Sequence, residues 1–181
     1  MNIPNLLTLL RIIMVPVVVI FLIQGSFGKA MITFVAAALS DALDGFLART
    51  LGQQTVLGAY LDPIADKALL ASSFVTLSVL RVIPGWLTVI VISRDIIILI
   101  GILVLTMMSI EVKIRPTAVS KITTAMQLAA VLLVLSDRCF PGYIHKIWLM
   151  GLFWLTASFT IVSGLDYIMR GQKLINQDTK K

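Results

Sequence analysis

The chain has 181 residues, of which 59% are hydrophobic and only 13% are charged. Its mean hydropathy is +1.00, and a soluble domain of this size could not bury so much apolar surface. The formal net charge of +6 therefore suits an anionic lipid surface or a phosphate-bearing substrate rather than nucleic acid. Cys139 is the single cysteine, which excludes an internal disulfide and a cysteine-based metal site.

The apolar residues form long runs without the alternation of strands, so the sequence predicts an all-α, polytopic membrane protein. A spanning helix needs roughly 20 residues, and the runs predict six transmembrane helices. In chain order these cover residues 6–24, 30–51, 55–80, 85–108, 117–136 and 144–169. We expect one transmembrane domain over residues 1–170 and a polar, loosely ordered cytoplasmic tail over residues 171–181.

Lysines and arginines near the predicted helix ends indicate the orientation, because they are enriched in cytoplasmic loops. Six spans place both chain termini on one side of the membrane. That side receives eight cationic residues: Arg49, Lys113, Arg115, Lys121, Arg170, Lys173, Lys180 and Lys181. The other side receives four: Lys29, Arg81, Arg138 and Lys146. We therefore expect both termini in the cytoplasm.

Four aspartates interrupt this apolar sequence, and carboxylates inside membrane helices are costly and usually functional. Asp41 and Asp44 share one face of the second predicted helix, and Asp62 and Asp66 share one face of the third. A predicted turn around Gln53 makes the two helices antiparallel. Asp44 and Asp62 are then each nine residues from Gln53, while Asp41 and Asp66 are twelve and thirteen residues from it. The four carboxylates are therefore expected at two matched levels.

Carboxylates that converge in a low-dielectric site repel one another unless cations neutralise them. Hard oxygen ligands select Mg²⁺, Mn²⁺ or Ca²⁺, and no histidine or further soft ligand lies nearby to favour zinc. Four carboxylates have enough oxygens to bridge two divalent ions, an arrangement used for phosphoryl transfer.

Small residues and an arginine accompany the aspartates. Gly45 and Ala48 follow Asp44 on one helix, and Gly58 lies on the other. Close packing of membrane helices would explain the small residues. Between paired aspartates they also indicate a cleft for a flat group such as a nucleotide base. Arg49 could bind a phosphate with two nitrogens, or anchor the helix end at the cytoplasmic surface.

These residues together resemble the signature of the CDP-alcohol phosphatidyltransferases. The match is complete at eight positions over 26 residues, written Asp41-x2-Asp44-Gly45-x2-Ala48-Arg49-x8-Gly58-x3-Asp62-x3-Asp66. The six-span layout and the opening Asn2-Ile3-Pro4-Asn5 are also similar to this family. Asn5, Thr8 and Arg11 could reach the donor site, or simply begin an interfacial helix.

The resemblance implies that an alcohol attacks CDP-diacylglycerol, releasing CMP and forming a phosphodiester. It implies two divalent ions, Mg²⁺ or Mn²⁺, surrounded by the four aspartates, with Asp66 as general base. Gly45, Ala48 and Gly58 would line the cytidine pocket, and Arg49 would meet the donor diphosphate. It also implies a homodimer. We expect a bacterial inner membrane as the location, with the site facing the cytoplasm, where soluble CMP leaves and the lipid remains.

The acceptor alcohol is open between two groups of the family. Arg94, Arg115 and Lys121 are candidates to bind an acceptor phosphate, although Arg94 could equally form a buried ion pair with Asp95. A phosphate-bearing acceptor favours glycerol 3-phosphate or phosphatidylglycerol. The signature and opening resemble phosphatidylglycerophosphate synthases, which we place first. The stretches Ser93-Arg94-Asp95 and Arg115-Pro116-Thr117 resemble CMP-forming cardiolipin synthases, the second candidate.

A different class of function is an ion-coupled transporter, since membrane-embedded aspartates also bind transported ions. Transport does not explain why two glycines, an alanine and an arginine keep fixed spacing to the carboxylates. Internal repeats are also not evident in the sequence.

Overall fold

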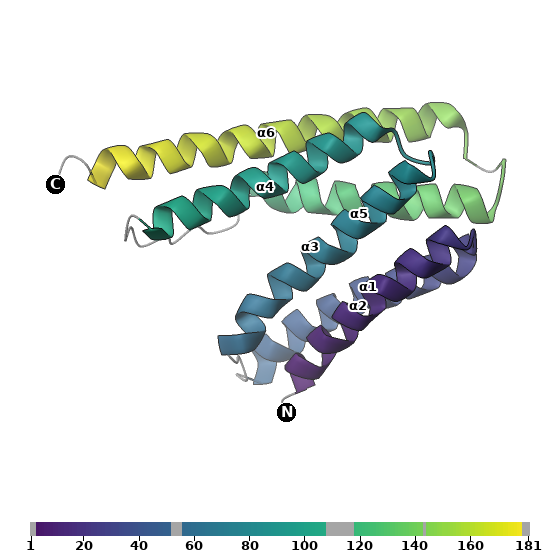
Figure 1. Ribbon diagram of the computed structural model, residues 1–181, viewed down its shortest axis with the longest axis horizontal. Helices are drawn as coiled ribbons and strands as arrows, with labels where there is room; N and C mark the ends of the chain where they lie inside the picture. Colours follow the sequence, from purple (N-terminus) through teal and green to yellow (C-terminus); the bar gives the residue numbers. More distant parts are fainter. Residues whose placement is uncertain (1–2, 52–55, 108–117, 143, 179–181) are drawn as a thin grey trace. The chain divides into compact units, whose positions relative to one another are not determined.

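The computed structural model is built from α-helices throughout the residues it describes, which are 3–51, 56–107, 118–142 and 144–178 (Figure 1). Side chains are described for fewer positions within these ranges, namely 9–40, 65, 67–105, 107, 118–142 and 144–172. The described part contains six helices: α1 (Ile3–Ile23), α2 (Phe27–Leu51), α3 (Val56–Val79), α4 (Gly85–Met107), α5 (Ala118–Cys139) and α6 (Lys146–Asp178). The all-α class predicted from the sequence is confirmed for these residues.

The helices follow the predicted apolar runs, with one correction. α6 continues to Asp178, beyond the expected end at residue 169. Residues 171–178 are therefore helical and not a loosely ordered tail. The segment contains Gln172, Lys173 and Leu174, which are good helix formers, and it has no proline to end the helix. The polar residues of this segment indicated exposure to water, but a helix can be exposed to water and remain helical.

Three helices in the described part are long and apolar enough to cross a membrane. These segments are Gly85–Leu105, Ala118–Cys139 and Lys146–Gln172. Shorter apolar helical segments cover Leu9–Ile23, Phe27–Ser40 and Lys67–Val79. The chain thus has the character of a membrane protein, whereas the arrangement with six spans stays a prediction.

The helices form two compact units. Unit 1 comprises Met1–Pro84 and Val131–His145, and unit 2 comprises Gly85–Ala130 and Lys146–Lys181. A single domain over residues 1–170 stays a prediction.

In unit 1, α1 contacts both α2 and α3, and α2 contacts α3. Phe34 and Phe74 are fully buried and contribute the largest apolar side chains of this core. The end of α5 joins the same unit, where the Ser136 hydroxyl donates a hydrogen bond to the Met31 sulfur at 3.6 Å. Burial of these side chains fixes the position of the two helices that carry the aspartates.

In unit 2, α4 contacts α6, and the first part of α5 is bonded to α6 by polar side chains. The Thr123 hydroxyl donates to the Phe159 carbonyl at 3.0 Å, and the Gln127 amide donates to the Thr160 hydroxyl at 3.5 Å. Trp86 of α4 and Trp154 of α6 stack with their ring centroids 5.0 Å apart. Side-chain hydrogen bonds between helices of this kind stabilise membrane bundles.

Two helix ends in unit 1 use the same cap with different residues. Gly25 follows α1 with φ of 70°, and Arg81 follows α3 with φ of 57°. Behind Arg81, the Val82 amide donates to the Leu77 carbonyl at 2.8 Å, as in a Schellman motif. A glycine adopts this left-handed conformation freely, whereas a side chain makes it costly.

We expect Arg81→Gly to stabilise the protein, because it removes the left-handed strain at an exposed position. The free energy of unfolding should rise by about 1 kcal/mol, after the entropic cost of glycine is subtracted. Thermal unfolding in detergent micelles measures this change. Arg81→Lys is the matched control and should leave stability unchanged, since lysine meets the same strain. A lower stability of Arg81→Gly would contradict the prediction.

Candidate functional site

The predicted metal ligands lie on two neighbouring helices of unit 1. Asp41 and Asp44 are on α2, and Asp62 and Asp66 are on α3. Asp41 lies ten residues before the end of α2 at Leu51, and Asp66 lies ten residues after the start of α3 at Val56. At 1.5 Å per residue, both lie about 15 Å from these helix ends.

Asp44 and Asp62 lie at a second matched level, seven and six residues from the same helix ends. The helix ends thus bracket the predicted turn around Gln53, and they confirm that all four aspartates are helical. The side chains of the whole signature lie outside the described residues: Asp41, Asp44, Gly45, Ala48, Arg49, Gly58, Asp62 and Asp66. Their convergence on one site stays a prediction.

Among the side chains that the structure does describe, no group of three or more histidines, cysteines or acidic residues is gathered to hold a metal ion. The four signature carboxylates stay the predicted ligands for a divalent ion. Their chemistry fits a hard cation, because carboxylate oxygens are the ligands that Mg²⁺ and Mn²⁺ prefer.

A cation is buried at the level of the aspartates. Arg11 of α1 is completely buried, and α1 contacts both α2 and α3. Arg11 lies fourteen residues before the Gly25 turn, and Asp41 lies sixteen residues after it. In antiparallel helices this places the two residues within about 3 Å of the same level along the axis. The sequence left two interpretations of Arg11, a residue of the donor site or part of an interfacial helix start. Full burial of its side chain is inconsistent with the second.

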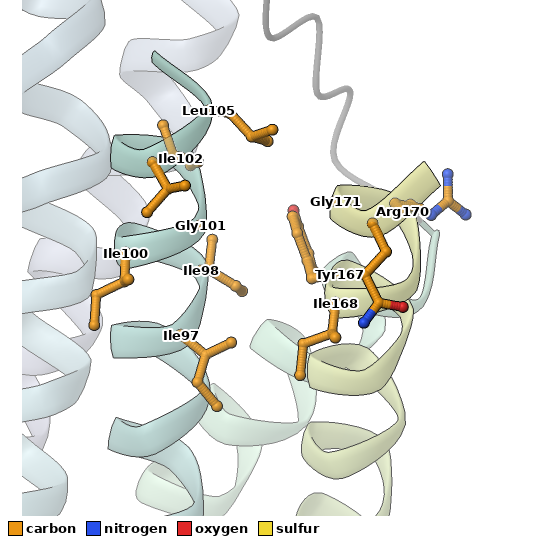
Figure 2. A pocket seen from close by; sticks show the side chains of 12 residues that line it. Ile97, Ile98, Ile100, Gly101, Ile102, Leu105, Tyr167, Ile168, Arg170 and Gly171 are labelled. Carbon is orange, nitrogen blue, oxygen red and sulfur yellow. The ribbon is translucent and has the colours of Figure 1, made fainter. Parts of the chain in front are cut away.

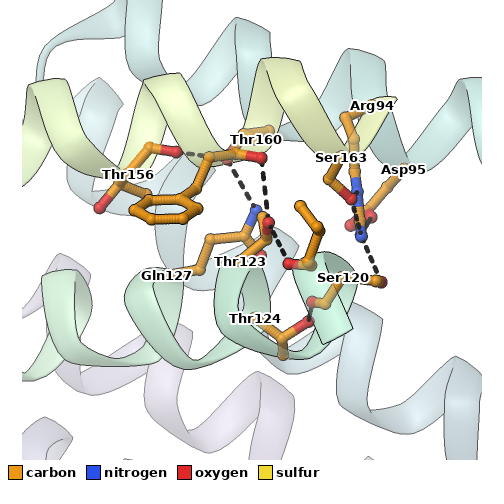
Figure 3. Close-up of polar contacts among 11 residues, drawn as sticks. Arg94, Asp95, Ser120, Thr123, Thr124, Gln127, Thr156, Thr160 and Ser163 are labelled. Carbon is orange, nitrogen blue, oxygen red and sulfur yellow. Dashed lines mark hydrogen bonds and ion pairs between the residues drawn. The ribbon is translucent and has the colours of Figure 1, made fainter. Parts of the chain in front are cut away.

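Arg94 of α4 joins all three helices of unit 2 (Figure 3). It is 6% exposed, and its Nη1 forms an ion pair with the Asp95 carboxylate at 2.8 Å. Its Nη2 donates to the Ser120 hydroxyl of α5 at 2.6 Å and to the Ser163 hydroxyl of α6 at 2.9 Å. Nε also donates to Ser163, at 3.3 Å.

The surroundings of Arg94 add to this arrangement. The Tyr167 ring centroid lies 5.9 Å from the guanidinium carbon, a cation–π distance. Gly164 gives the side chain room, since a Cβ there would lie 3.7 Å from the Arg94 Cγ. All these partners belong to the chain itself. The geometry thus favours a structural role for Arg94, one of the two alternatives left open by the sequence.

Of the other two acceptor candidates, the structure describes the side chain of Lys121 but not Arg115. Lys121 follows Ser120 directly on α5, and its side chain is exposed. The bond from Arg94 to Ser120 therefore fixes the helical turn that presents Lys121. Arg115 lies outside the described residues. Ser120 and Ser163 were not identified from the sequence as partners of Arg94, because no local pattern links residues so far apart.

Comparison with known proteins decides the family. Residues 1–162 match the sequence model of the CDP-alcohol phosphatidyltransferase family. The chain belongs to this family. CDP-alcohol phosphatidyltransferases are enzymes and generally use divalent metal ions. The chain is thus an enzyme, which removes the support for an ion-coupled transporter.

Individual relatives cover most of the chain. A probable phosphatidylglycerophosphate synthase of Mycobacterium tuberculosis is 34% identical over 93% of this chain and 81% of its own length. A CDP-diacylglycerol–glycerol-3-phosphate 3-phosphatidyltransferase of Pseudomonas fluorescens is 32% identical over 100% and 95%, respectively. The CMP-forming cardiolipin synthase of Homo sapiens is 33% identical over 96% of this chain and 63% of its own length.

We expect Arg94→Lys to destabilise this CDP-alcohol phosphatidyltransferase, because a single ammonium cannot replace bonds to Asp95, Ser120 and Ser163 together. Loss of charge-assisted hydrogen bonds in this way lowers the free energy of unfolding by about 2 kcal/mol. Thermal unfolding in detergent micelles checks the loss.

Arg138→Lys is the matched control, since Arg138 is exposed and surface substitutions change stability by less than about 0.5 kcal/mol. Unchanged stability of Arg94→Lys, together with a raised KM for the acceptor, would instead assign Arg94 to acceptor binding.

Proposed function

We propose that this enzyme is a phosphatidylglycerophosphate synthase that transfers a phosphatidyl group from CDP-diacylglycerol to glycerol 3-phosphate. The complete eight-position signature carries the proposal, because it defines the donor and the transfer chemistry. Two relatives named for phosphatidylglycerophosphate synthesis or its transferase reaction support the acceptor, one of them over nearly its whole length.

The reaction is a substitution at phosphorus. The hydroxyl oxygen of glycerol 3-phosphate forms a bond to the phosphorus of the phosphatidyl group, and the bond from that phosphorus to CMP breaks. CMP leaves with the bonding electron pair. Asp66 accepts the hydroxyl proton as general base, which makes the oxygen a stronger nucleophile.

The four aspartates hold the divalent ions that the reaction needs, and we propose Mg²⁺ or Mn²⁺, two per site. When bound, such ions polarise the phosphoryl oxygens and stabilise charge on the leaving group. Asp41, Asp44 and Asp62 serve as ligands, and Asp66 serves as both ligand and base. Placement on two helices, rather than on loops, suits ligands that must keep a fixed geometry.

The remaining signature residues bind the donor. Gly45, Ala48 and Gly58 leave space for the cytidine ring beside the carboxylates, because they have no side chain beyond Cβ. Arg49 complements the donor diphosphate through its planar guanidinium. We place this site at the cytoplasmic face, where CMP leaves into water while the lipid product stays in the bilayer.

We propose that Lys121 and Arg115 bind the phosphate of glycerol 3-phosphate. The exposed position of Lys121 at the start of α5 supports this. Arg94 acts as a positioning residue in this proposal, because its bond to Ser120 fixes the turn that carries Lys121.

The protein is proposed to be integral to the bacterial inner membrane, with six spans, both termini in the cytoplasm, and a homodimeric assembly. The excess of cationic residues on the side of the termini supports the orientation.

A second candidate is a CMP-forming cardiolipin synthase, which would use phosphatidylglycerol as acceptor. The stretch Ser93-Arg94-Asp95 favours it, and the human relative with that name is 33% identical. Both candidates share the donor and the release of CMP, so the acceptor alone distinguishes them.

We expect purified protein in detergent to release CMP from CDP-diacylglycerol when glycerol 3-phosphate and Mg²⁺ or Mn²⁺ are supplied, and not after chelation of the ions. Asp66→Asn should lower the rate by at least about 10²-fold, since an amide cannot accept the proton. Asp137→Asn is the matched control, because Asp137 lies outside the signature on α5. CMP release only with phosphatidylglycerol would identify the cardiolipin synthase, and none with either acceptor would contradict both.

We expect Lys121→Gln to raise the KM for glycerol 3-phosphate about tenfold, because a charge-assisted bond to phosphate is lost. The KM for CDP-diacylglycerol and kcat should change little. Steady-state CMP release with each substrate varied separately measures this split. Lys29→Gln is the control, since Lys29 is also exposed and helical but lies on α2. An unchanged KM for glycerol 3-phosphate would assign its phosphate to other residues.

A further inference from the structure

A cavity of about 310 Å³ lies between α4 and α6 in unit 2. Its walls are almost entirely apolar and include Ile97, Ile98, Gly101 and Leu105 of α4, and Tyr167 and Ile168 of α6. We call this cavity the α4–α6 slot. Figure 2 shows the α4 side chains on one wall and Tyr167 facing them from the other. The volume falls within the range of sites that take small molecules or lipid chains.

One charged side chain lies at the rim of the slot. The Arg170 side chain is 57% exposed, and its Nε donates to both carboxylate oxygens of Asp166, at 2.9 and 3.0 Å. This ion pair leaves Nη1 and Nη2 without a hydrogen bond in the described part of the chain. These two nitrogens have the spacing that binds a phosphate through parallel hydrogen bonds.

We propose that the α4–α6 slot binds one acyl chain of a glycerophospholipid, whose phosphodiester is held by Nη1 and Nη2 of Arg170. The apolar walls match a hydrocarbon chain, and the cation at the rim matches the anionic phosphate that adjoins it. Arginine is suited to this position because its stem covers apolar surface while its guanidinium stays at the polar boundary.

This site is separate in sequence from the signature, whose residues all lie on α2 and α3. It also differs from ordinary contact with bilayer lipid. Residues such as Ile161 and Leu165 of α6 are exposed without lining the slot. The proposal does not rest on the proposed acceptor or on catalysis.

Two glycines give a sharp test. Gly101 lines the slot, and a Cβ placed there would meet no atom within 4 Å. Gly101→Leu therefore adds a side chain to the slot from an unhindered Cβ, and leucine also favours the helix. Gly151 of α6 has the same open surroundings but lies outside the slot, so Gly151→Leu is the matched control.

The experiment uses phosphatidylglycerol that carries a photoactivatable diazirine in one acyl chain, added to the full-length protein in lipid nanodiscs. After irradiation, labelled peptides are quantified by mass spectrometry. We expect label to concentrate in residues 97–105 and 167–172. Gly101→Leu should lower it there about tenfold, because the chain loses the burial of several methylenes. Gly151→Leu should leave it unchanged.

A second pair of variants tests the phosphate contact. Arg170→Gln should lower labelling of the same peptides about tenfold, whereas Arg138→Gln, at an exposed arginine of α5, should not. The proposal is overturned if label spreads evenly over the exposed helices, or if Gly101→Leu and Arg170→Gln label like the parent protein. Cross-links between two copies at the slot residues would also overturn it, because a second chain would then occupy the slot.

Discussion

The cost of placing charge in an apolar helical protein governs how this chain is organised. With 13% of its residues charged, it still buries Arg11 and Arg94 among the side chains that the structure describes. A buried ion is tolerated only when opposite charge and hydrogen bonds replace the lost water. Arg94 shows one solution, with Asp95, Ser120 and Ser163 bonded to its three nitrogens. The metal site proposed for the signature aspartates would be the other solution, because bound cations offset an excess of carboxylates.

Antiparallel helices joined by short turns convert sequence spacing into depth. Because α1, α2 and α3 contact one another, residues at equal distances from a turn lie at equal levels. This relation places Asp41 and Asp66 ten residues from their helix ends, and Arg11 near the level of Asp41. In the proposed site, a buried cation at this level would lower the mutual repulsion of the four carboxylates.

The sequence predicted the helices well, because their apolar runs are long and the turns between them are short. The helical position of the four aspartates also followed from spacing alone. The hydrogen bonds of Arg94 could not be predicted in this way. Ser120 and Ser163 lie 26 and 69 residues away, and only the tertiary fold brings them together. The left-handed residue Arg81 was equally hidden, because the usual signal for that conformation is a glycine, as at Gly25. The α4–α6 slot depends on side-chain packing, which periodicity does not describe.

The division into two units suggests how one fold serves different acceptors. Every signature residue belongs to unit 1, whereas Arg94 and Lys121 belong to unit 2. The relatives include one named for phosphatidylglycerophosphate synthesis and one named for CMP-forming cardiolipin synthesis. In the proposed function, acceptor choice depends on residues around the start of α5, where Arg94 is bonded to Ser120 and the neighbouring Lys121 is exposed.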